Sequence, residues 1–148
     1  MAQQTASTIQ ITRPADTTSY SIGDTLSQST SAGTVSAVGI GGSCRKIILS
    51  KSSGAAQATF DLHLFSADPG ATQDNAALAI TFANNGTSYL GKISLAVTAT
   101  ANGMTYIEKD LSANPFLLPS PCYVVPVFTA TYAPASAEKF AITFLTER

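Results

Sequence analysis

The chain has 148 residues, 45% of them hydrophobic, which is enough for one domain of this length to bury a substantial core. Only 11% are charged, against about 25% in an average soluble domain. The formal net charge of −1 offers no electrostatic footprint for nucleic acid, which needs clustered Lys and Arg, and no apolar run approaches the roughly 20 residues of a membrane span. Such a charge-poor surface is typical either of lasting contact with other protein chains or of a neutral soluble β domain.

The chain opens with a short apolar and polar alternation, TIQIT at 8–12, which predicts a first strand. A hydroxyl-rich stretch with several turn signals follows, and Pro14 pushes the preceding Arg13 into an extended conformation. We expect residues 1–33 to be an extended arm with the first strand, and residues 34–148 to be a β-sandwich. The arm either grips a neighbouring molecule or forms a strand and a surface loop of the same domain.

Four further stretches in the first two thirds of the chain favour strands by their alternation. In RKIILSK at 45–51, Arg45, Lys46 and Lys51 are expected on a solvated face. In TFDLHLF at 59–65, Asp61 and His63 point away from the face formed by the apolar residues. AALAITF at 76–82 could instead form a short helix. The stretches are TVSAVGI at 34–40, RKIILSK at 45–51, TFDLHLF at 59–65 and AALAITF at 76–82.

Two hairpins are predicted in the last third. Asn102-Gly103 is typical of a two-residue type I′ turn, which places Ala101 opposite Met104 and Ala99 opposite Tyr106, with Ile93, Leu95 and Val97 continuing the apolar face. The second hairpin joins 122–132 to 139–146, and Pro126 is expected at an edge or a bulge because it cannot donate to a ladder. Eight or nine short strands in all indicate an all-β sandwich, jelly roll or barrel.

Few residues offer catalytic or ligand-binding chemistry. His63 is the single histidine, and with Asp61 it is interpreted as a surface pair rather than an acid–base or metal pair. Asp68 and Asp74 flank a Pro-Gly turn and are weak candidates for calcium ligands, since aspartates are common in turns. The sequence therefore predicts no catalytic, cofactor-binding or metal-binding residue, and no enzyme activity.

Two other features that carry chemistry in some proteins receive a plain structural interpretation. GIGGS at 39–43 precedes a strand rather than a helix, so it lacks the helix dipole of a phosphate-binding loop. Cys44 and Cys122 match no zinc or redox spacing. They are expected to be buried free thiols, and a disulfide stays open if the protein reaches an oxidising medium.

Three motifs carry a resemblance to a known family. They are ITRPADTTSYSIGD at 11–24, the stretch at 60–95 that contains LHLF and DNAA, and VVPVFTATYAPASAEKFAITF at 124–144. In this order they resemble a widespread family of tailed-bacteriophage structural proteins. The residues that carry the motifs are Arg13, Pro14, Tyr20, Gly23, Asp24, Leu62, Leu64, Phe65, Asp74, Asn75, Tyr132, Pro134, Glu138 and Phe140.

The resemblance implies a virion component, a capsid cement (decoration) protein with a jelly-roll-like sandwich that binds the major capsid protein as a homotrimer. Its location would be the capsid surface after assembly in the host cytoplasm, without cofactor, nucleic acid or membrane. The alternative is a receptor- or glycan-binding domain of a phage tail or head fibre. The interface is expected at the arm and at an exposed edge, and its candidate residues are Ile11, Arg13, Pro14, Tyr20 and Pro126.

Overall fold

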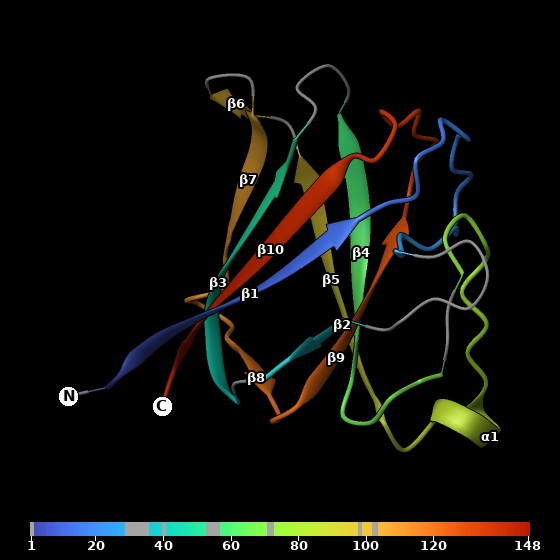
Figure 1. Cartoon of the computed structure of the whole chain (residues 1–148). Coiled ribbons are helices and arrows are strands. Elements are labelled where there is room, and N and C mark those ends of the chain that lie inside the picture. Colours follow the sequence, from blue (N-terminus) through green and yellow to red (C-terminus); the bar gives the residue numbers. More distant parts are fainter. Residues whose placement is uncertain are drawn as a thin grey trace.

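The computed structural model describes residues 2–28, 36–39, 41–52, 57–70, 73–97, 99–101 and 104–148. Within them the chain is nearly all β, as the sequence predicts, and its two antiparallel sheets pack face to face (Figure 1). The strands are β1 (Gln4–Thr12), β2 (Ser36–Val38), β3 (Gly42–Lys51), β4 (Ala58–Phe65), β5 (Tyr89–Val97), β6 (Ala99–Ala101), β7 (Met104–Asp110), β8 (Phe116–Leu118), β9 (Cys122–Phe128) and β10 (Lys139–Glu147), and a short helix, α1 (Phe82–Asn85), precedes β5.

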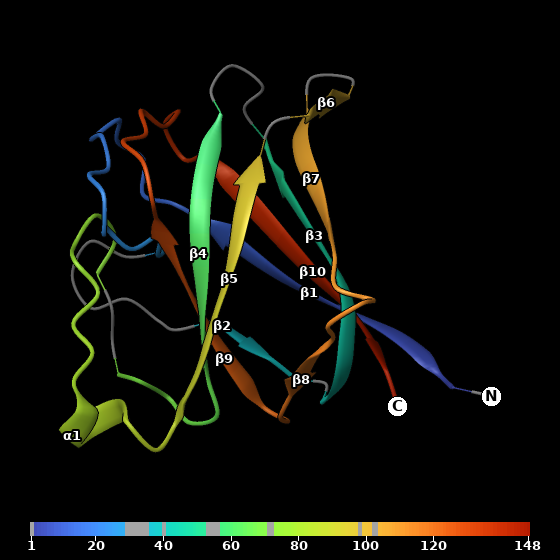
Figure 2. The ribbon, with the colours of Figure 1, turned by 180° about the vertical axis from the view of Figure 1, so that it is seen from behind.

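The first sheet has the order β1-β10-β3-β7-β6, with β8 pairing the start of β3, and the second has the order β2-β9-β4-β5. Strands distant in sequence lie side by side, and the two chain ends meet because β1 pairs β10 along its whole length. Figure 2 shows both layers from behind, with N and C at the same end. Among the described residues no helix is long and apolar enough to cross a membrane.

The core lies between the sheets and follows the period-2 alternation of the strands. β10 shows it most clearly, because its residues alternate between buried and partly buried along the strand. Aromatic rings fill the centre: Phe60 packs against Phe128 with centroids 4.5 Å apart and against Phe140 edge to face at 5.6 Å. Burial of these rings contributes much of the hydrophobic stabilisation.

The first predicted hairpin is confirmed only in the strand pairs next to its turn. β6 pairs β7 in the predicted register, with Ala99 opposite Tyr106 and Ala101 opposite Met104, while Asn102-Gly103 lies outside the described residues. The preceding strand was placed wrongly, since β5 pairs β4 in the other sheet. The alternation of Ile93 and Leu95 fixes which face is buried but does not specify the sheet.

The second predicted hairpin is wrong. β9 pairs β2 and β4 in the second sheet, whereas β10 pairs β1 and β3 in the first. The segment between them therefore crosses from one layer to the other. An antiparallel sandwich accepts such a connection because both strands still turn their apolar faces to the same core.

The stretch AALAITF forms neither a regular strand nor a helix over its length. Asp74 and Asn75 form a turn, Ala77 makes one isolated bridge to Asp24, and the four-residue helix begins only at Phe82, capped by the Thr81 hydroxyl. Leu78 and Ile80 pack over Phe65 and the valines of β9, on the face of the second sheet that points away from the main core. β9 is thus covered on both faces, which explains its nearly continuous apolar sequence.

As far as residue 28, the hydroxyl-rich N-terminal stretch is built into the same domain. β1 is the edge strand of the first sheet, and the chain then runs beside β9 in the second. Leu26 donates its amide to the carbonyl of Pro126, and Phe128 donates to that of Asp24. The expectation that Pro126 lies at an exposed edge is therefore corrected: the edge of β9 at Pro126 is covered by residues 24–26, and Pro126 is buried.

Candidate interaction surface

The motif residues near the N-terminus form a buried polar cluster at the end of the sandwich. The hydroxyl of Tyr20 donates to Oδ1 of Asp74 at 2.6 Å and accepts from Nε of Arg13 at 3.0 Å. Arg13 also donates to Asp16 Oδ1 at 2.8 Å and to the carbonyl of Ala135 at 3.2 Å. Burial raises the pKa of Tyr20, so its hydroxyl stays protonated and serves as a donor.

The C-terminal motif builds an adjoining cluster around Glu138. Tyr132 donates its hydroxyl to the Glu138 carboxylate at 2.8 Å, and the Lys51 ammonium lies 3.3 Å from Oε1 of Glu138. Lys51 and Glu138 have fully buried side chains, so each charge needs the other. The ring of Phe128 stacks on Tyr20 at one side and on Tyr132 at the other, and so connects the two clusters.

The expectation of a solvated Lys51 is wrong, and a β-bulge supplies the reason. The pairing of β10 with β3 shifts between Leu145 and Thr146, where Arg45 is the extra residue on β3. A bulge exchanges the two faces of the strand beyond it. Ile47, Leu49 and Lys51 consequently point inward, while Arg45 and Lys46 remain partly exposed as predicted. No pattern in the sequence around Arg45 indicates this bulge.

The candidate interface residues are found mainly inside the molecule. Ile11, Arg13 and Tyr20 are each 1% exposed, Pro126 is buried, and Pro14 is half-buried. Apart from Pro14, their side chains are enclosed by this chain's own residues. The motif residues brought together here, among them Arg13, Tyr20 and Asp74, act in packing and hydrogen bonding.

His63 and Asp61 do not bond to each other. Asp61 accepts from the Lys92 ammonium and from the Ser94 hydroxyl, both at 2.6 Å. His63 instead contacts the Tyr89 hydroxyl through Nδ1 at 3.1 Å, and burial lowers its pKa. The arrangement is a cross-strand polar cluster on the outer face of the second sheet.

The other candidate ligands are also occupied by structural contacts. Asp68 caps the amide of Gly70 in the predicted turn at 2.9 Å, while Asp74 belongs to the buried cluster with Tyr20. Cys44 and Cys122 are buried free thiols. Over the described ranges, no group of three or more His, Cys, Asp or Glu residues is arranged to hold a metal ion.

The described surface combines few charges with several exposed apolar side chains. The chain has eight basic and nine acidic residues, and five of these charged residues are buried: Arg13, Lys51, Asp61, Asp74 and Glu138. By contrast, Phe82 is 90% exposed, Leu117 75% and Ile22 71%. These three lie on α1, on β8 and in the loop after β1, so apolar groups face the solvent on separate parts of the surface.

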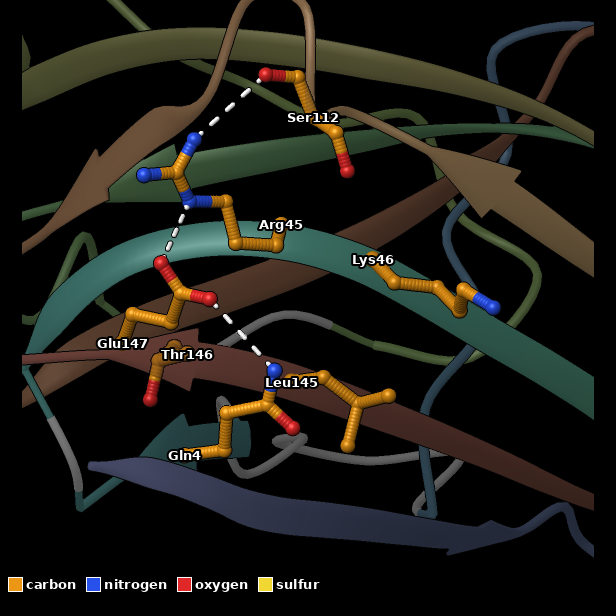
Figure 3. A pocket seen from close by; sticks show the side chains of 7 residues that line it. All are labelled: Gln4, Arg45, Lys46, Ser112, Leu145, Thr146 and Glu147. Atoms are coloured by element: carbon orange, nitrogen blue, oxygen red, sulfur yellow. Dashed lines mark hydrogen bonds and ion pairs between the residues drawn. The ribbon is translucent and has the colours of Figure 1, made fainter. Parts of the chain in front are cut away.

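A hollow of about 500 Å³ lies on the first sheet, between the loop after β7 and the start of β1. Figure 3 shows a chain of polar contacts across it: Arg45 donates to the Ser112 carbonyl at 3.4 Å and to Glu147 at 3.0 Å, and Gln4 donates to Glu147 at 3.4 Å. Lys46 points away from this chain and pairs with Glu108. Within the lining Arg45 pairs with Glu147, while the partner of Lys46 lies outside it, so each charged side chain of the hollow already has an opposite charge beside it.

The sequence was compared with models of protein families and with curated proteins. Neither comparison finds a match. The geometry of the described residues and the resemblance of the motifs are therefore the basis for a functional proposal.

Proposed function

We propose that this protein is a non-enzymatic structural protein of a tailed-phage virion, a capsid cement protein that binds the assembled head and stabilises contacts between capsomers. Its partner would be the major capsid protein, and the resemblance adds a homotrimer on the capsid surface. The observation that carries the proposal is the surface: Phe82, Leu117 and Ile22 are exposed while five charged residues are buried. Apolar groups with few surrounding charges are cheap to desolvate on a protein partner.

Two further observations support the proposal. The motif residues behind the resemblance, such as Arg13, Tyr20 and Glu138, lie in a buried network that stabilises the fold, as expected of motifs in a structural protein. The strand order also supports a jelly-roll-like class: β1–β10, β2–β9, β3–β7 and β4–β5 form nested antiparallel pairs, as in a long hairpin folded over itself.

The test is the copy number of the chain in purified virions, measured by quantitative mass spectrometry against the major capsid protein. Comparable copy numbers support a cement protein that covers the head. A handful of copies per particle favours the fibre domain, and absence from the particle overturns the proposal.

A second measurement addresses the surface itself. Heads prepared without the protein are incubated with purified wild type, with Phe82→Ala or with Leu117→Ala, and the bound chain is quantified after sedimentation. We expect at least one variant to bind several-fold more weakly, because its exposed side chain is lost at the contact. Gln57→Ala, at another exposed position, is the control and should bind as wild type does. Unchanged binding by both apolar variants contradicts the role of this surface.

A further inference from the structure

The free edge of β1 is an unusual feature of the first sheet. Residues 3 and 148 exchange both backbone hydrogen bonds, and the β1–β10 register continues without a shift from Gln4 to Thr12. In an antiparallel ladder the residues of one strand point their backbone groups alternately toward and away from the partner. Odd positions of β1 therefore bond β10, and even positions turn their amides and carbonyls outward.

The outward positions of β1 are open to solvent. They are Gln4, Ala6, Thr8, Gln10 and Thr12, and each of these residues is exposed. Their backbone groups make no hydrogen bond to a described segment on the open side of β1. Nothing in QTASTIQIT protects such an edge, since the strand has no charge, no proline and no bulge.

The other sheet edges in the described part of the chain are protected. At the far side of the first sheet, β6 has three residues, and β7 continues as Glu108, Lys109 and Asp110. In the second sheet, β2 has three residues, while β5 carries Lys92 and faces a register shift between Leu64 and Phe65. Short strands, charges and irregular pairing are the usual means of preventing edge-to-edge association.

We propose that β1 pairs antiparallel with β1 of a second copy of this chain, about a two-fold axis at Thr8. A second copy offers one long and uncharged edge, which is again β1. In this register Gln4 faces Thr12 of the second copy, Ala6 faces Gln10, and Thr8 faces its own equivalent. Every pair joins two outward positions, so the outward amides and carbonyls bond one another, and no like charges meet.

The contact joins two first sheets into one continuous sheet. It is isologous, because both copies use the same surface. It does not depend on binding to a phage head, so β1 pairing can fail while head binding stands, and the reverse also holds. A homotrimer agrees with β1 pairing only where two trimers join into a hexamer.

Thr8→Lys is the variant that tests the contact. It places two ammonium groups opposite each other across the two-fold axis, at a side chain that is exposed in the single chain. Thr87→Lys adds the same charge at an exposed position in the turn after α1 and is the matched control. Ala6→Pro removes one outward amide without touching the bonds to β10, and so tests the edge without adding charge.

The first readout is the mass in solution, by size-exclusion chromatography with light scattering over a concentration series. We expect wild type and Thr87→Lys to reach twice the mass of one 15.3 kDa chain or an even multiple of it, and Thr8→Lys and Ala6→Pro to lose half of that mass. Wild type that stays a monomer, or forms only an odd-numbered assembly, overturns the proposal.

The second readout is amide hydrogen exchange, resolved by residue. In wild type at high concentration, the amides of Ala6, Thr8 and Gln10 should exchange slowly. In Thr8→Lys the amides of Ala6 and Gln10 should become fast, while those of Ser7 and Ile9 stay slow because they bond β10 and show that the variant is folded. Fast exchange at the even positions of wild type contradicts β1 pairing.

Discussion

The hydroxyl of Tyr20 lies 2.6 Å from Oδ1 of Asp74, a residue 54 positions later in the chain, and both side chains are buried. Arg13 donates to the same hydroxyl and lies 3.8 Å from the second oxygen of Asp74. One tyrosine thus joins a cation from the end of β1 to a carboxylate from the segment that covers β9. This contact fixes the course of the hydroxyl-rich stretch against its own domain.

Tyr20→Phe is expected to lower the free energy of unfolding by about 1–3 kcal/mol, because it leaves buried polar groups of Arg13 and Asp74 without their shared partner. Urea unfolding followed by circular dichroism measures the change. Tyr123→Phe is the control, since Tyr123 is half-buried and its hydroxyl makes no hydrogen bond within the described residues. A loss no larger than that of the control would contradict a stabilising role for the cluster.

Glu138→Gln should lower the free energy of unfolding by about 3–5 kcal/mol, because it leaves the charge of Lys51 in the core without its carboxylate. The exposed pair of Lys46 and Glu108 provides the matched comparison. Glu108→Gln should cost less than about 1 kcal/mol in the same urea titration. Equal costs for the two variants would show that burial of the Lys51–Glu138 pair is unimportant.

Asp61 should make stability depend on pH at the acid end. Burial acts to raise its pKa, but the bonds from Lys92 and Ser94 outweigh burial and lower the pKa below the ordinary 3.8. The unfolded chain then binds the proton more readily, so this stabilisation is present above pH 3.8 and is lost as the pH falls through the folded-state pKa. Urea midpoints measured from pH 6 to about pH 2 should fall less steeply at the acid end in Asp61→Asn.

The two cysteines should react slowly in the folded protein. Burial raises the pKa of both Cys44 and Cys122 to about 11, so little thiolate is present near neutral pH. Titration with a thiol reagent should find no rapid reaction in buffer and both thiols in urea. Rapid labelling of the native protein would contradict their burial, and an absence of thiols in urea without reductant would indicate a disulfide.

The amino-acid sequence determined the class of the fold and the faces of most strands. Alternation in TFDLHLF and in the last strand gave the buried side, and the Asn102-Gly103 pair gave the register of β6 with β7. The three motifs also contain the residues of the buried network except Lys51, although their partners were not apparent. These features are local, because period-2 alternation and turn geometry act over a few residues.

Only the tertiary structure decided which sheet each strand joins and where the charged side chains lie. β5 and β9 do not pair with the strands predicted as their hairpin partners. Both sheets face one core, so the alternation of apolar residues is compatible with pairing in either sheet. Lys51 turned inward because a bulge at Arg45 exchanged the faces of β3, and Glu138 from the far end of the chain receives its charge. Such pairings join distant residues, and the packing of the whole molecule selects them.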